Sequence, residues 1–163
     1  KVLFMGGGGG HVAYMMGFLH GMLRDPALRS ALTAQKVALG GVSSGAVVMH
    51  YGVSDLRGVL SMREWYHDYV RKVYEVSTQH ATGALHVTSD VIELLARRWY
   101  DVNKKILGDK FPWCDCSVAL VAEAFSFLPC FITDFFSAHH FGQIVKATTY
   151  IPGLTDLAPF RFL

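Results

Sequence analysis

Five consecutive glycines directly follow a short apolar run at the start of the chain, and they restrict the fold more than any other feature. Residues 1–5 are typical of a buried strand. Residues 6–10 are all glycine, which favours neither helix nor strand interiors. From His11 onward, apolar residues recur at helical spacing. The pattern predicts a strand, a loop of bare backbone N–H groups and a helix that begins where the loop ends, an arrangement suited to an anion.

The same order of elements returns in the next part of the sequence. The apolar residues 36–39 are closed by Gly40 and Gly41, and a helical pattern resumes over residues 46–51. A repeated strand–helix order is typical of an open α/β sheet whose strands are mostly parallel. Asp25, which precedes a proline, is expected to end the first helix.

Two further helices are expected in the middle of the chain. The first covers residues 56–79, and the second begins at Asp90 and ends near Leu107. Asp90 is the expected N-cap of the second helix, because Glu93 follows at the spacing of a capping box. These helices interrupt the strand–helix rhythm, so we expect them to cover one side of the sheet.

The last third predicts two more strands and a short helix. Residues 117–127 are a strongly apolar run, Pro129 interrupts it, and residues 130–133 resume it. A pair of strands joined by a turn is the simplest interpretation. Residues 139–148 have a helical pattern. With no repeat or linker in the sequence, residues 1–163 are expected to form one domain.

Composition excludes several classes of protein. Hydrophobic residues make up 52% of the 163 residues and charged residues 17%, which excludes intrinsic disorder. The formal net charge is +2, without the clustered basic charge of a nucleic-acid binder. The longest apolar stretch, residues 117–133, contains Glu123 and Pro129, so no transmembrane helix is expected.

The three cysteines point to neither a disulfide scaffold nor a metal site. Cys114 and Cys116 lack the Cys-x-x-Cys spacing of a zinc site. Cys130 is the only other cysteine, so the sequence has no second pair to complete such a site. An odd, small number of cysteines favours a reducing compartment. We therefore expect no metal and no cofactor, and an intracellular location, either cytoplasmic or at the periphery of a membrane.

The second glycine feature has the form Gly-x-Ser-x-Gly and predicts a nucleophile elbow. Its serine is Ser43, and the small residues that flank it are Gly41 and Gly45. In such an elbow a sharp strand-to-helix turn exposes the serine hydroxyl at the carboxyl edge of the sheet. Ser44 also carries a hydroxyl, but the motif is centred on Ser43.

The two glycine features together suggest acyl transfer. Attack by a serine creates a tetrahedral oxyanion, which needs preorganised backbone donors. The loop after the first strand would lie beside the elbow after the second, and would supply those donors. The candidate oxyanion-hole residues are Gly7, Gly8, Gly9 and Gly10.

On these motifs the sequence resembles the patatin-like phospholipase family. Residues 6–11, the Gly-x-Leu of residues 17–19 and residues 41–46 are similar to that family's glycine loop, first helix and elbow. Residues 146–154 resemble its late Pro-Gly stretch. The resemblance implies a three-layer α/β fold with a mostly parallel central sheet and helices on both faces. It also implies a Ser–Asp dyad that hydrolyses lipid acyl esters, with a membrane or lipid-droplet surface as a partner.

The sequence departs from the family pattern in two places. The family's aspartate lies in an Asp-Gly motif, and this sequence has no Asp-Gly pair. Asp156 lacks the glycine and lies too early, so the aspartate is expected beyond residue 163. His11 and Val12 stand where the family usually has Arg-Gly.

Two alternatives remain open. One is an esterase with a Ser–His–Asp triad, in which Asp134 and either His139 or His140 follow Ser43 in the required order. The other is a catalytically inactive lipid-binding or regulatory module with a patatin-like fold.

Overall fold

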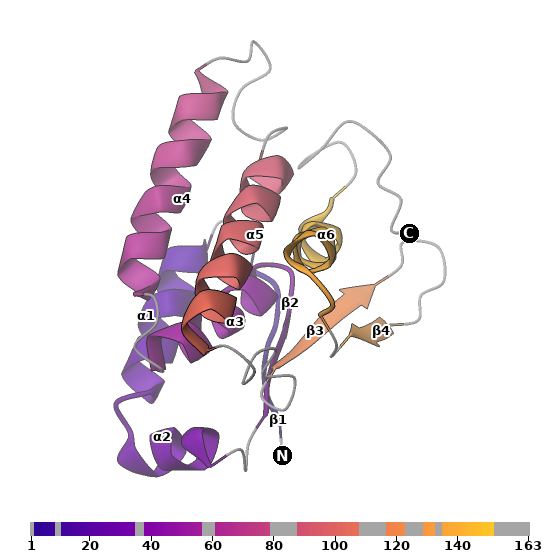
Figure 1. The fold of residues 1–163 in the computed structure, drawn as a ribbon. Helices are drawn as coiled ribbons and strands as arrows, with labels where there is room; N and C mark the ends of the chain where they lie inside the picture. The colour runs from indigo at the N-terminus through magenta and orange to yellow at the C-terminus, as the bar shows by residue number, and fades with distance from the viewer. Residues whose placement is uncertain are drawn as a thin grey trace.

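The computed structural model describes residues 2–8, 11–34, 38–56, 61–78, 88–107, 117–122, 129–132 and 135–151. Within them the chain is an α/β protein (Figure 1). In chain order the elements are β1 (Val2–Met5), α1 (Val12–Met22), α2 (Pro26–Thr33), β2 (Ala38–Val42), α3 (Ser44–Leu56), α4 (Met62–Ser77), α5 (Thr88–Leu107), β3 (Ser117–Ala122), β4 (Pro129–Ile132) and α6 (Ala138–Thr149).

The described strands form one mostly parallel sheet in the order β1-β2-β3-β4. β1 and β3 both pair with β2 in parallel, and β4 pairs with β3 antiparallel. This confirms both the predicted strand–helix rhythm and the predicted strand pair near Pro129. Met5 lies opposite Gly41, so β1 and β2 end almost level. The segments that follow these two strands therefore lie at the same edge of the sheet.

The second strand is longer than its sequence predicted. Gly40 and Gly41 were expected to close it, but β2 continues through both of them to Val42. The reason is strand pairing: the two glycines lie opposite Phe4 and Met5 in the parallel ladder. Backbone hydrogen bonding from a neighbouring strand thus overrides the weak strand propensity of glycine.

Two helix boundaries also differ from the prediction. Asp25 was expected only to end the first helix, yet its carboxylate accepts hydrogen bonds from the backbone N–H groups of Ala27 and Leu28 and caps α2. Asp90 was expected to cap α5, which instead begins at Thr88. The Asp90 carboxylate lies 2.5 Å from Lys146 Nζ, so it binds α6 rather than capping its own helix.

The two middle helices, α4 and α5, were expected to cover one side of the sheet, but they pack on other helices instead. α3 contacts β1, β2 and β3, and α6 contacts β3. α4 packs on α3, and α5 packs on α4 and α6 (Figure 1). The largest fully buried side chains include Leu19, Met49, Trp99, Phe141 and Ile144. None of the helices in the described ranges is long and apolar enough to cross a lipid bilayer.

Candidate functional site

Ser43 lies in the turn between β2 and α3 with a left-handed backbone. Its φ is 56°, and it is the only non-glycine residue with a positive φ among those described. This conformation costs a non-glycine residue roughly 1–2 kcal/mol. The Ser43 carbonyl accepts the first helical hydrogen bonds of α3, from the N–H groups of Ala46 and Val47. The sharp strand–serine–helix turn predicted from the motif is therefore present.

Gly41 and Gly45 are required by the close approach of the backbone around Ser43. A Cβ atom on Gly41 would lie 2.5 Å from the backbone nitrogen of Ala46. A Cβ atom on Gly45 would overlap the carbonyl oxygen of Met5 and lie 2.5 Å from that of Gly6. Neither neighbour is a flexible side chain, so the turn admits no larger residue at either position.

The glycine loop after β1 passes directly beside the elbow. A Cβ atom on Gly7 would lie 2.9 Å from the Cβ of Ser43 and 3.6 Å from its Oγ. The Gly8 N–H donates a 2.7 Å hydrogen bond to Ser44 Oγ. The expected juxtaposition of loop and elbow is thus confirmed, and the absence of a side chain at Gly7 leaves the room that this approach needs.

Ser44 and Ser43 play different parts although they are adjacent. Ser44 is buried, and its hydroxyl accepts from Gly8 and donates to the sulfur of Met15, 3.6 Å away. Ser44 thereby joins the glycine loop to α1. The Ser43 side chain is half-buried. The Ser44 hydroxyl is therefore the one that binds the glycine loop, through the Gly8 N–H.

The expected oxyanion donors are only partly described. Gly9 and Gly10 lie outside the described residues. The Gly8 N–H is engaged with Ser44 in this structure. Of the two described oxyanion candidates, Gly7 and Gly8, Gly7 approaches Ser43 more closely. The loop leads into the N-terminus of α1, and α3 begins at Ser44, directly after Ser43, so the positive ends of two helix dipoles lie near the elbow.

Thr148, near the C-terminal end of α6, contacts the elbow directly. Its hydroxyl oxygen accepts a 2.9 Å hydrogen bond from the Ser43 backbone N–H. Thr148 is 8% exposed. No sequence motif points to Thr148 itself, although it lies in the stretch that resembles the family's Pro-Gly segment. The contact joins residues 105 positions apart, so no local pattern could predict it, and the resemblance of this stretch was the one available signal.

His139 and His140 lie at the opposite end of α6. Thr148 follows His140 by two helical turns, which corresponds to roughly 12 Å along the helix axis. His139 Nδ1 lies 2.6 Å from an Arg97 guanidinium nitrogen. His140 Nδ1 accepts a hydrogen bond from the Phe136 N–H, and its ring stacks on the Phe136 ring. The structure therefore does not bring either imidazole to Ser43. Asp134 lies outside the described residues.

His11 turns toward the glycine loop rather than away from it. Its Nδ1 lies 2.8 Å from the Gly8 carbonyl oxygen, which also accepts from the His11 backbone N–H. A carbonyl only accepts, so Nδ1 carries the proton in this contact. His11 stands where the family usually has arginine, and here it closes the loop at the start of α1.

His50 is the most deeply buried titratable side chain near the elbow, and it lies on α3. Burial lowers the pKa of His50 to about 4, although the hydrogen bond from its ring to the Ala46 carbonyl opposes the shift. The Phe141 and Trp99 rings surround it at centroid distances of 5.1 Å and 5.8 Å. His50 is therefore neutral at pH 7 and belongs to the core.

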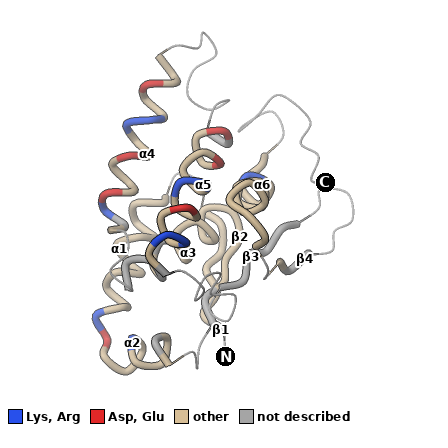
Figure 2. Tube along the Cα trace, viewed as in Figure 1, with Lys and Arg blue, Asp and Glu red and all other residues tan. Residues whose placement is uncertain are grey.

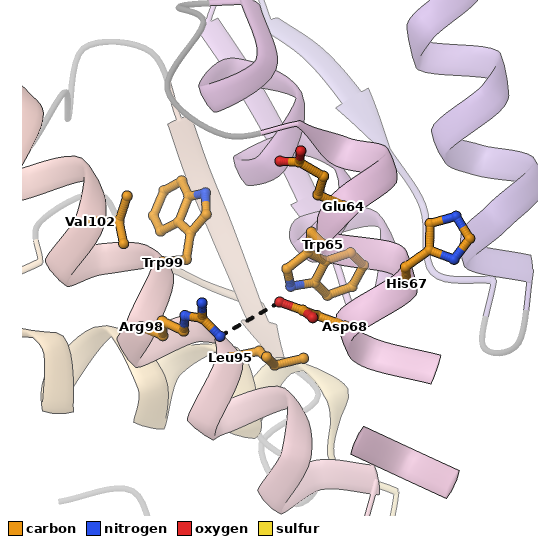
Figure 3. A pocket seen from close by; sticks show the side chains of 8 residues that line it. All are labelled: Glu64, Trp65, His67, Asp68, Leu95, Arg98, Trp99 and Val102. Carbon is orange, nitrogen blue, oxygen red and sulfur yellow. Dashed lines mark ion pairs between the residues drawn. The ribbon is translucent and has the colours of Figure 1, made fainter. Parts of the chain in front are cut away.

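Two cavities open elsewhere on the helices. One of about 420 Å³ lies between α4 and α5, over Trp65 and Trp99, and the Arg98–Asp68 ion pair of 3.5 Å spans its rim (Figure 3). The other, of about 480 Å³, lies between α1 and the start of α4. Neither is lined by Ser43 or by the described loop glycines.

The described residues contain no cluster of His, Cys, Asp and Glu that could hold a metal ion. Likewise, within those residues no carboxylate or imidazole makes a hydrogen bond to the Ser43 hydroxyl. No protein-family model, curated protein or solved structure matches this chain. The resemblance to patatin-like phospholipases therefore stays a prediction from the sequence motifs.

Proposed function

We propose that the chain is a serine acyl hydrolase of lipid esters, with the three-layer patatin-like fold, in which Ser43 forms the acyl-enzyme. The observation that carries the proposal is the left-handed φ of 56° at Ser43, directly beside the glycine loop. Strained non-glycine residues cluster at functional sites, because surroundings must be built to hold them. Here Gly41, Gly45 and Thr148 hold the turn.

The proposed reaction follows from this placement. The Ser43 Oγ attacks the ester carbonyl carbon and passes its proton to the base of the dyad. The carbonyl oxygen becomes an oxyanion, which N–H groups of the glycine loop stabilise. The leaving alcohol takes up a proton as its bond to the carbonyl carbon breaks, and water then hydrolyses the acyl-serine. The base is an aspartate from outside the described residues.

A catalytically inactive lipid-binding module is the second candidate, and one observation favours it. The Gly8 N–H, an expected oxyanion donor, is already bonded to Ser44. If Gly7, Gly9 and Gly10 supply no donors either, the elbow would lack the electrostatic stabilisation that the reaction needs.

The decisive experiment measures intact mass after exposure of the full-length polypeptide to a fluorophosphonate. We expect one adduct on the wild-type protein and none on Ser43→Ala. Ser44→Ala is the matched control, since it removes the neighbouring hydroxyl but leaves the predicted nucleophile, and it should still be labelled. No adduct on a folded wild-type chain would contradict the hydrolase proposal and favour the lipid-binding module.

The same assay tests the triad alternative. His139→Ala and His140→Ala should keep most of the labelling rate, because both side chains lie at the far end of α6 from Thr148. Loss of labelling in either variant, with circular dichroism unchanged, would contradict the Ser–Asp dyad and support the triad.

A further inference from the structure

A cluster of polar side chains joins α5 to α6, and Glu93 lies at its centre. Helix α5 carries both signs of charge along its length, whereas Lys146 is the only Lys, Arg, Asp or Glu of α6 (Figure 2). Glu93 Oε1 accepts a 2.7 Å hydrogen bond from Gln143 Nε2, and Glu93 Oε2 lies 3.6 Å from Lys146 Nζ. Gln143 and Lys146 are three positions apart, so both lie on the side of α6 that faces α5.

The Glu93 carboxylate is also held from its own helix. Arg97, one turn further along α5, forms an ion pair with Glu93 Oε1. The side chains of Glu93 and Lys146 are each 13% exposed, so salt and water screen their attraction little. Asp90, the other partner of Lys146, has a side chain that is 65% exposed. Of these two carboxylates, Glu93 therefore makes the firmer link to α6.

The two sides of α6 are attached to the protein in different ways. On the side of the cluster, a Cβ atom on Gly142 would lie 2.8 Å from Arg97 Cγ and 3.2 Å from Glu93 Cγ, so only glycine allows this approach. The other side buries Phe141 and Ile144 in the core. Apolar packing is non-directional, whereas a hydrogen bond requires a particular distance and angle. The apolar side thus attaches α6 to the core, and the polar cluster fixes where it lies against α5.

We infer that Glu93 is a positioning residue for the Ser43 elbow and acts through α6. Thr148 follows Lys146 by two residues, which is about 3 Å along the helix axis, so the two move together. The Thr148 hydroxyl accepts the 2.9 Å hydrogen bond from the Ser43 N–H. Such a bond extends to only about 3.2 Å, so a small displacement of α6 would break it. This inference rests on the proposed function, because positioning affects chemistry only if Ser43 reacts.

Hydrogen exchange of the Ser43 amide, followed by NMR on the full-length polypeptide, tests the inference without requiring a reaction. The Gly40 amide of the central strand β2 is the internal reference, since its exchange reports opening of the sheet. In Glu93→Ala we expect the ratio of the Ser43 rate to the Gly40 rate to rise by on the order of tenfold. Ile144→Val is the matched control: it weakens the apolar side of the same helix, and it should keep the wild-type ratio.

Fluorophosphonate labelling gives the second readout. Glu93→Ala should slow the labelling of Ser43 by on the order of tenfold, and Ile144→Val should stay close to the wild-type rate. Glu93→Gln keeps the length of the side chain and an acceptor oxygen for Gln143, so it should recover most of the loss in both readouts.

Gln143→Leu keeps the test decisive if Glu93→Ala does not fold. It removes the donor on α6 and leaves the charges of the cluster in place, so the exchange ratio should rise by about threefold. An unchanged ratio in the folded Gln143→Leu protein would then contradict the role of the cluster.

The outcomes separate positioning from catalysis. An unchanged exchange ratio in folded Glu93→Ala, or an equal rise in Ile144→Val, would overturn the inference. So would a raised ratio with labelling at the wild-type rate, since Ser43 would then react without support from α6. A raised ratio in Glu93→Ala, with no labelling of the wild type, would remove the proposed reaction and leave Glu93 as the residue that positions the elbow.

Discussion

Helix α3 takes part in two regions that are built by opposite means. At its first turn, the elbow is formed by backbone atoms that approach one another closely around Gly41, Ser43 and Gly45. Further along the same helix, His50 is enclosed by side chains, with the Phe135, Phe141 and Trp99 rings around it. The first region has no space for another atom. The second encloses a titratable group, His50, among aromatic rings, and its ring also bonds the Ala46 carbonyl.

This difference determines what each region tolerates. Backbone cannot move aside without disturbing the sheet, so the elbow should be sensitive to the addition of a single methyl group. The aromatic cluster should accept an apolar side chain in place of His50 and should be sensitive to charge instead. Three predictions test this contrast, in order of expected effect.

The largest effect is expected from Gly45→Ala. Its methyl group would overlap the Met5 carbonyl, which belongs to the neighbouring strand. We expect the free energy of unfolding to fall by on the order of 4 kcal/mol or more, measured by urea denaturation. Gly21→Ala is the control: it meets open space in α1 and should be neutral or stabilising. Similar stability of the two variants would show that the elbow is not tightly packed.

The second prediction concerns acid sensitivity. The pKa of His50 is about 4 in the folded chain, against about 6.5 when unfolded. Between these values the unfolded state binds a proton that the folded state does not, so stability falls as the pH drops from 6.5 to 4. The loss from this group should be on the order of 3 kcal/mol.

His50→Leu isolates that contribution. The variant should lose less stability than the wild type over the same pH range, because it has no imidazole to protonate. Urea denaturation at several pH values measures the difference in slope. Parallel curves for variant and wild type would mean that the folded chain accommodates the protonated ring.

The smallest effect is expected from Thr148→Val, which keeps the shape of the side chain and removes the acceptor for the Ser43 N–H. An unsatisfied buried donor costs roughly 1–3 kcal/mol. We expect a stability loss in that range and slower fluorophosphonate labelling of Ser43. Thr148→Ser keeps the hydroxyl and should restore the labelling rate. If the valine variant were labelled at the wild-type rate, Thr148 would have no part in positioning the serine.

The sequence was informative wherever a local rule decides the structure. Apolar runs and glycine turns located β1, β2 and the elbow, and Pro129 located the strand pair of β3 and β4. Ser43 was identified because a short motif imposes a particular backbone turn. The α/β class with parallel pairing followed from the repeated strand–helix order.

The features that were missed depend on contacts between distant segments. Asp90 fits a capping pattern, yet an ion pair with Lys146 of α6 takes up its carboxylate. Gly40 extends β2 because Phe4 lies opposite it. α4 and α5 pack on other helices rather than on the sheet, and no local pattern shows which surface a helix will meet.

The hydrogen bonds that hold the elbow also determine when it can assemble. They join positions that are 36 and 105 residues apart, so the geometry of the elbow depends on segments from distant parts of the sequence. Contacts of such long sequence separation form late, because their loops must close first. During refolding we expect helical circular dichroism to return before fluorophosphonate reactivity. In the native state, a brief opening of α6 would break the hydrogen bond between Thr148 and the Ser43 N–H. Hydrogen exchange in α6 should therefore report how often the elbow loses this support.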